Sequence, residues 1–125
     1  MSYQHEWEKE GVYVKFSDKL TSLDLITSNS QMVGKSEFQD AKYAIVDFNH
    51  INEIDIGDID VKIAESFAVS VNPYNPNIKV ALISTHSELQ ELIEKYIEFT
   101  QLKITHAQQK SFENLEEARK WISEK

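Results

Sequence analysis

Residues 43–48 read YAIVDF, a nearly continuous apolar run with one acidic residue near its end. Apolar residues that do not alternate with polar ones are typical of a strand buried on both faces, as in a parallel sheet covered by helices. Residues 78–83, IKVALI, repeat the pattern. The two runs together predict the central strands of an α/β fold.

The segments on either side of residues 43–48 have the spacing and end signals of helices. Apolar residues recur at helical period over residues 59–71, and the two prolines of residues 72–76, NPYNP, prevent the helix from continuing. Upstream, Thr21 followed by Asp24 resembles a capping box, and Gly34 supplies a stop. We therefore expect a helix before and after the central strand.

The N-terminal segment predicts a β-hairpin. Residues 3–8 alternate between aromatic and polar side chains, and residues 12–16 alternate again. A turn around Glu10 and Gly11 would pair the two strands.

The C-terminal third continues the alternation of strand and helix. Residues 84–87, STHS, offer capping side chains for a helix with apolar positions at 89–97. Residues 105–111 are polar and predict an edge strand. Asn114 and Glu117 predict the cap of a final helix. The expected order is β-β-α-β-α-β-α-β-α, around a mixed, mostly parallel sheet.

Composition limits the functional classes. A length of 125 residues with 41% hydrophobic residues predicts a single domain over residues 1–125. The net charge of −8 repels phosphate backbones, so nucleic acid is not an expected partner. The absence of cysteine excludes disulfides, thiolate metal sites and cysteine nucleophiles. Neither a signal-peptide pattern nor a membrane-spanning apolar run is present, so we expect a cytoplasmic protein that is not integral to the membrane.

Four segments in this order resemble the STAS domains of anti-sigma-factor antagonists, and most of all the SpoIIAA-like family. They are residues 11–17 (GVYVKFS), 43–48 (YAIVDF), 77–81 (NIKVA) and 115–121 (LEEARKW). The resemblance covers nearly the whole chain and implies a STAS/SpoIIAA-like fold.

The resemblance also bears on function. In anti-sigma-factor antagonists, a pattern resembling Asp-Ser-Ser-Gly carries a phosphorylated serine, whereas residues 55–58 here read DIGD. Ile56 and Gly57 offer no hydroxyl, so the resemblance does not extend to the phospho-switch. SpoIIAA-like proteins are also similar to the CRAL-TRIO lipid-binding fold, which implies an apolar ligand held between the sheet and the helices. We therefore expect a non-catalytic binding or protein-interaction module.

The acidic segment between residues 47 and 60 is the first candidate site. Asp47, His50, Asp55 and Asp58 follow a predicted parallel strand, at the sheet edge where α/β proteins bind ligands. The carboxylates of this segment, together with His50, could hold Mg²⁺, which takes oxygen ligands, so a Mg²⁺-dependent phosphoryl-handling protein is an alternative. The simpler interpretation is that Asp55 or Asp58 caps the following helix. His86, at the end of the next strand, would meet Asp47 and His50 at this edge.

The second candidate is the apolar excess of the helix over residues 59–71. Its apolar residues exceed one narrow stripe, and the excess would face a lipid tail or a protein partner. Tyr74, in the proline-flanked turn, is a further candidate contact. The apolar candidates of this surface are Ile56, Ile59, Ile63, Phe67 and Tyr74.

Other chemistry lacks its residues. Gly11, Gly34 and Gly57 are too scattered to form a phosphate-binding loop, so we expect no nucleotide cofactor. The four histidines lie on four segments and predict no metal site. A third alternative is a structural homodimer, joined through strand edges or helix faces.

Overall fold

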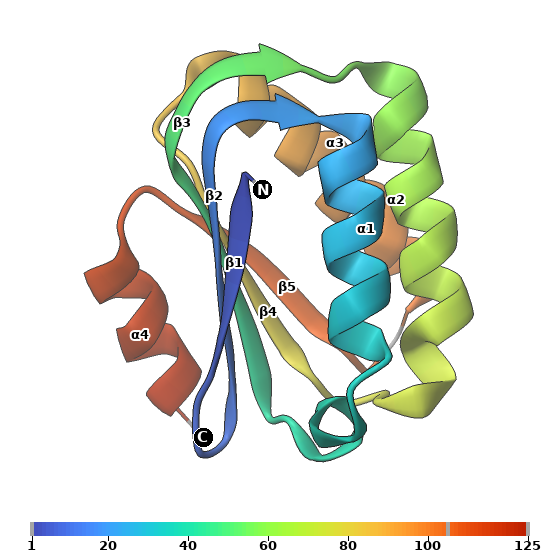
Figure 1. Ribbon diagram of the computed structural model, residues 1–125. Coiled ribbons are helices and arrows are strands. Elements are labelled where there is room, and N and C mark those ends of the chain that lie inside the picture. Colours follow the sequence, from blue (N-terminus) through green and yellow to red (C-terminus); the bar gives the residue numbers. More distant parts are fainter. Residues whose placement is uncertain (1, 105, 125) are drawn as a thin grey trace.

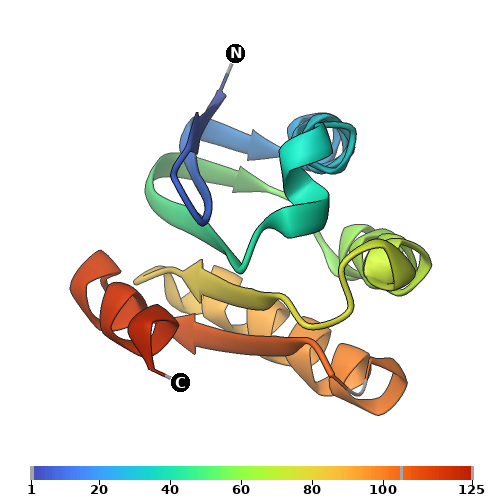
Figure 2. The ribbon, with the colours of Figure 1, turned by 90° about the horizontal axis from the view of Figure 1, so that it is seen from below.

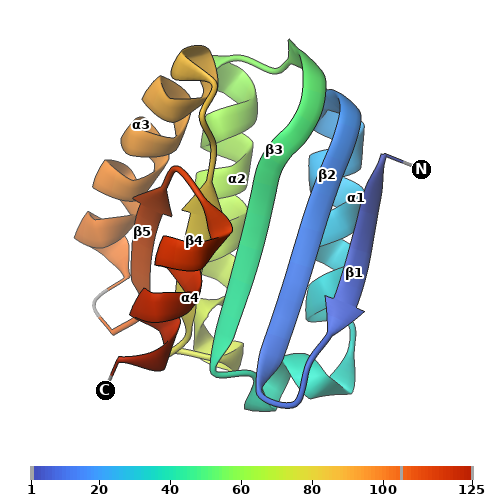
Figure 3. The ribbon, with the colours of Figure 1, turned by 90° about the vertical axis from the view of Figure 1, so that its left-hand side faces the viewer.

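The structure, a computed structural model, describes residues 2–104 and 106–124. Its five strands form one sheet in the order β1-β2-β3-β4-β5 (Figure 3). The first pair is antiparallel and the other pairs are parallel. The strands are β1 (Tyr3–Trp7), β2 (Gly11–Thr21), β3 (Tyr43–Asp55), β4 (Lys79–Ile83) and β5 (Gln108–Phe112).

Four α-helices cover the two faces of this sheet unequally. Figure 1 shows α1, α2 and α3 on one face and α4 on the other, and the view from below in Figure 2 shows the same layers. Each of the first three helices connects two neighbouring parallel strands, which is the usual crossover of α/β proteins. The helices are α1 (Ser22–Val33), α2 (Asp58–Val71), α3 (Ser87–Lys103) and α4 (Leu115–Ser123).

The predicted order of elements is confirmed, with two short 3₁₀ helices added. These are η1 (Ser36–Asp40), which precedes β3, and η2 (Asn72–Tyr74), which extends the end of α2. The edge position predicted for the last strand is also confirmed, since β5 pairs only with β4 among the described residues. That strand begins later than expected, and Thr105, where we placed its start, lies outside the described residues.

The N-terminal hairpin forms as predicted, although its turn lies slightly earlier, before Gly11. The N–H of Glu8 donates to the carbonyl of Gly11 at 2.8 Å. Gly11 lies directly against Tyr43 on β3, because a Cβ atom there would approach the ring and carbonyl oxygen of Tyr43 to 2.5 Å. A glycine is therefore required where β2 begins to pair with β3.

Strands β2 and β3 are longer than their sequence patterns predicted. Register shifts interrupt their pairing between Lys15 and Ser17 and again between Asp18 and Lys19, where Asp18 has a φ of 60°. Both strands bend toward the helices beyond this point (Figure 1). The acidic residues up to Asp55, which were expected to follow the strand of residues 43–48, therefore belong to the strand itself.

Three helix starts show how far capping signals are reliable. Thr21 Oγ1 accepts from the N–H of Asp24 at 3.2 Å, and Asn114 Oδ1 accepts from the N–H of Glu117 at 2.8 Å, as predicted. At α2 the side chain that makes the capping hydrogen bond belongs to the first turn of the helix. Asp60 Oδ2 accepts from the backbone N–H of Gly57 at 2.9 Å.

The expected caps of α2 were Asp55 or Asp58, and neither fills that position. Asp55 ends β3, and Asp58 is the first residue of α2. Gly57 occupies the cap position in an extended conformation. The acidic first turn still favours the positive end of the helix.

The apolar core has two parts because the sheet is covered on both faces. The larger part lies between the sheet and α1, α2 and α3, and includes Phe16, Phe48 and Leu82. The smaller part lies under α4 and centres on Ile45 and Ile83. No helix among the described residues is both long enough and apolar enough to cross a membrane.

Candidate functional site

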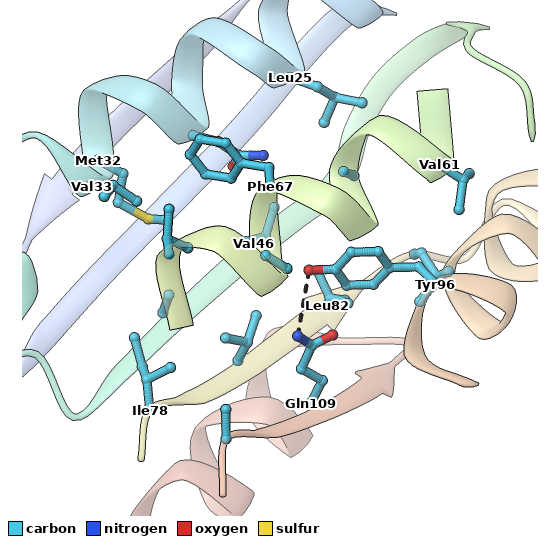
Figure 4. Close-up of a pocket in the computed structure, with 18 of the residues that line it drawn as sticks. Leu25, Met32, Val33, Val46, Val61, Phe67, Ile78, Leu82, Tyr96 and Gln109 are labelled. Carbon is cyan, nitrogen blue, oxygen red and sulfur yellow. Dashed lines mark hydrogen bonds between the residues drawn. The ribbon is translucent and has the colours of Figure 1, made fainter. Parts of the chain in front are cut away.

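A cavity of about 170 Å³ lies between the sheet and the three helices on its larger face. Figure 4 shows apolar side chains from strands and helices converging on it, among them Val46, Leu82 and Phe67. Val46 and Val80 are on central strands, where the sequence predicted complete burial, yet both are only partly buried. Both side chains border the cavity and also pack against the larger part of the core.

The cavity exists because α2 packs mainly against its helical neighbour. Within the described residues, the backbone of α2 approaches α3 extensively and the strands only sparsely. Side chains on the inner surface of α2 that could fill the space are small, notably Ala64 and Ala68. The larger Phe67 borders the cavity and stays partly exposed.

The apolar candidates on and around α2 divide into two sets. Ile56 and Phe67 line the cavity. Ile59 is 73% exposed, Ile63 is 46% exposed and Tyr74 is 61% exposed, so these three face outward. The sequence excess of apolar residues thus corresponds to a partly open cavity and, separately, to an outer surface.

Polar side chains also reach the cavity wall from α3 and β5. Gln109 Nε2 donates to the Tyr96 hydroxyl at 3.4 Å (Figure 4), and Thr100 Oγ1 donates to Gln109 Oε1 at 3.1 Å. Burial raises the pKa of Tyr96 to about 12, with a smaller contribution from the nearby carboxylate of Glu65. The phenol therefore stays neutral and can donate a hydrogen bond to a ligand.

Asp47 and His50 lie on the opposite face of the sheet, the one covered by α4. Asp47 is 4% exposed, and its Oδ2 accepts from the Tyr13 hydroxyl at 2.6 Å and lies 3.5 Å from His50 Nε2. The N–H of Asn49 donates to the other carboxylate oxygen at 2.9 Å. Burial and the neighbouring Asp47 raise the pKa of Tyr13 well above its usual range.

Asp55 and Asp58 pair with lysines and not with Asp47 or His50. Asp55 lies at the far end of β3 and its carboxylate is 3.8 Å from Lys19 Nζ. Asp58 pairs instead with Lys95 of α3 at 3.2 Å. Among the described residues, no three acidic or histidine side chains are grouped closely enough to hold a metal ion.

His86 also has different partners from those expected. Within the described part of the chain its side chain makes no capping hydrogen bond to α3, and its own N–H donates to Ser84 Oγ at 3.0 Å. The contact between β3 and the loop after β4 is made by Asn49, whose Oδ1 accepts from the N–H of Thr85 at 2.8 Å. The hydroxyls of residues 84–87 therefore order the loop more than they cap the helix.

Several cavity residues were not candidates from the sequence. Val46 and Val80 read as buried strand residues, and Tyr96 as part of an amphipathic helix. Asn72 and Gln109 belong to polar segments that gave no sign of burial. Apart from the family resemblance, the residues pointed toward an apolar site only through the apolar excess of α2, because side-chain spacing does not reveal how far a helix stands from a sheet.

One solved structure gives a comparison for the whole fold. It is described as an uncharacterized protein from the DUF3478 family with a SpoIIAA-like fold, from Shewanella loihica PV-4. The two chains are 16% identical and have a TM-score of 0.54, over 96% of this chain and 91% of that chain. No family model matches the chain, and no curated protein matches its sequence. The chain has a SpoIIAA-like fold, as its sequence resemblance predicted, and likeness at this identity concerns the fold alone.

Proposed function

We propose that this protein is a non-catalytic binding module that holds an apolar, lipid-like ligand in the cavity between the sheet and α2. The observation that supports the proposal is that Val46 and Val80, on central strands, are only partly buried and border a space of about 170 Å³ between the sheet and the helices. Protein interiors are normally close-packed, so a space of this size above the middle of a sheet is unusual.

The size and chemistry of the cavity suit part of an acyl chain or a ring. An engineered apolar cavity of about 150 Å³ stays free of water and binds benzene. Here the wall is formed mostly by Leu, Ile, Val, Phe and Ala side chains, and some wall residues, such as Met32 and Phe67, remain partly exposed. Burial of apolar ligand surface would supply the affinity, at roughly 25 cal/mol per Å².

The start of α2 supports a role other than phospho-switching. Ile56 and Gly57 stand where anti-sigma-factor antagonists carry the phosphorylated serine, and neither residue has a hydroxyl. Ile56 instead contributes its side chain to the cavity wall. We therefore assign this segment to ligand contact.

Native mass spectrometry of the freshly purified protein tests the proposal, because a retained ligand adds its mass directly. Ala68→Leu would narrow the cavity from the inner side of α2. Val69→Leu, on the outer side of the same helix, is the matched control, since Val69 is 37% exposed. We expect added mass, or saturable binding of a medium-chain alcohol, in the wild type and in Val69→Leu but not in Ala68→Leu. Absence of both in the wild type would contradict the proposal.

A Mg²⁺-dependent phosphoryl-handling role is the second candidate, favoured by the contact between Asp47 and His50. It would use those two residues without Asp55, which pairs with Lys19. Calorimetry with Mg²⁺ and Mn²⁺ distinguishes the two functions: binding that Asp47→Asn abolishes would favour this second candidate.

A further inference from the structure

Tyr96 of α3 contributes a hydroxyl group to the cavity wall, and no other described residue of the wall has one. Figure 4 shows its phenol reaching in from α3 toward Gln109 of β5, among the apolar side chains that surround the cavity. Both residues line the cavity, and both keep part of their surface exposed. The phenol is therefore a polar group that a ligand in the cavity can meet directly.

The Tyr96 hydroxyl is little used as a hydrogen-bond donor. In the described part of the chain it accepts from Gln109 Nε2 at 3.4 Å and donates to no acceptor. That contact is longer than the about 3.0 Å of an ordinary N–H···O hydrogen bond. Thr100 Oγ1 donates to Gln109 Oε1 at 3.1 Å, which turns the amide nitrogen of Gln109 toward the phenol. The phenol proton is thus left for a ligand acceptor, which would stabilise the complex.

Other polar groups of the wall are already used or lie out of reach. Asn75 Nδ2 donates to two backbone carbonyls, each at 2.7 Å. Asp60 Oδ2 accepts from the N–H of Gly57 at 2.9 Å. Asn72 Oδ1 is buried too deeply for a group in the cavity to touch it. Recognition of a polar ligand group therefore falls mainly to Tyr96 and its neighbour Gln109.

A charged ligand group would find little to pair with on this wall. Its described residues include no lysine, arginine or histidine to pair with an anion. Its one described acidic residue is Asp60, in the first turn of α2, and the buried carboxylate of Glu65 is not part of the wall. An ammonium group beside Tyr96 would instead face the hydrogens of the phenol and of the Gln109 amide. Because a charge also loses far more hydration energy than a neutral polar group, an uncharged acceptor suits the wall best.

We propose that the cavity binds an uncharged apolar ligand that carries a carbonyl or ether oxygen, and that the Tyr96 hydroxyl recognises this oxygen by donating a hydrogen bond to it. This inference rests on the proposed function and adds the class of ligand and the residue that selects it. The apolar wall supplies affinity for any ligand of suitable size, whereas Tyr96 distinguishes between ligands of the same size.

Three ligands with one carbon skeleton test the role of Tyr96 by calorimetry at about pH 7, where aliphatic amines are protonated. Acetophenone carries a carbonyl oxygen, α-methylstyrene has a CH₂ group of similar shape in its place, and 1-phenylethylamine is a cation. Each is somewhat larger than benzene, which a cavity of about 150 Å³ binds. Tyr96→Phe removes the hydroxyl alone. Tyr3→Phe is the matched control, because the Tyr3 hydroxyl donates to Gln31 at 2.9 Å and Tyr3 is not a wall residue.

The affinity for acetophenone relative to α-methylstyrene should fall about five- to tenfold in Tyr96→Phe, the value of one hydrogen bond, and stay unchanged in Tyr3→Phe. The wild type should bind 1-phenylethylamine at least about tenfold more weakly than acetophenone. An unchanged relative affinity in Tyr96→Phe, or tighter binding of the amine than of acetophenone, would overturn the inference and leave the binding function intact. Failure of all three ligands to bind the wild type would overturn the binding function as well.

Discussion

Asp47 shows how a carboxylate is accommodated in a central strand. It stands in an otherwise apolar run, and its burial is compensated by hydrogen bonds from Tyr13 and from the N–H of Asn49. If one of these donors were lost, the buried carboxylate would be less well satisfied, and the folded state would be destabilised. The residue is therefore a structural centre of the α4 face as well as a candidate functional group.

We predict that Tyr13→Phe destabilises the protein by about 1–3 kcal/mol, because Asp47 stays buried while losing a donor. Urea unfolding measures the change. In the double variant Tyr13→Phe/Asp47→Asn, the two effects should not be additive, because both residues belong to one hydrogen bond. Additive effects within error would show that the hydrogen bond contributes nothing.

Gly11 gives a prediction based on space alone. A methyl group at this position would approach the ring and carbonyl oxygen of Tyr43 to 2.5 Å, and the backbone oxygen cannot rotate away. We expect Gly11→Ala to destabilise the protein by about 1–3 kcal/mol, the usual cost of overpacking. Gly57→Ala is the control, since among the described residues, apart from its two chain neighbours, no atom lies within 4 Å of a Cβ there. Equal unfolding midpoints in urea for the two variants would contradict this.

At the scale of elements, α4 is joined to the N-terminal hairpin by one ion pair. Arg119 Nη1 and Nη2 each donate to a different carboxylate oxygen of Glu8 at 2.6 Å, and the Tyr43 hydroxyl donates to the same carboxylate. The contact connects the last helix to the first turn of the chain. It thereby closes the small core beneath α4.

We predict that Arg119→Ala lowers the free energy of unfolding by about 1 kcal/mol near neutral pH, with the value limited by partial solvent exposure of the pair. Arg119→Lys should recover only part of it, because lysine cannot make the two-point contact. Hydrogen bonding from Arg119 holds the pKa of Glu8 below its usual 4.5. The pair's contribution is therefore present above pH 4.5 and lost as the pH falls further, so the effect of Arg119→Ala should shrink in acid. Urea unfolding at neutral and acidic pH measures this, and an effect independent of pH would contradict it.

Local signals in the sequence predicted which elements form better than they predicted how long each element is. Helix starts at Thr21 and Asn114 were predictable because one side chain and one nearby N–H determine them. The extension of β3 to Asp55 was not, because its second half is polar and is held by pairing with β2 and by Lys19. Those contacts come from a segment distant in sequence, which spacing within β3 cannot reveal.

At the scale of the whole molecule, the cavity illustrates the limit of sequence patterns. The apolar excess of α2 predicted apolar surface but not its location, since the distance between α2 and the sheet depends on packing with α3. The polar wall groups of Asn72 and Gln109 come from elements far apart in the chain. Only the complete fold brings Asn72 and Gln109 to the wall of one cavity.

The stability of the whole protein should fall in alkaline solution, and Tyr96 gives a defined share of that fall. Its ordinary pKa of 10.0 is raised to about 12, mainly by burial, so the folded state holds its proton over a range in which the unfolded state releases it. The stabilising contribution is complete below pH 10 and is lost as the pH rises toward 12. At about pH 11 the loss from this group reaches about 1.4 kcal/mol. Urea unfolding of the wild type and of Tyr96→Phe at about pH 8 and 11 isolates it, because general charge repulsion affects both proteins alike. The variant should lose less stability between the two pH values, and parallel losses in both proteins would show that the Tyr96 proton is not linked to folding.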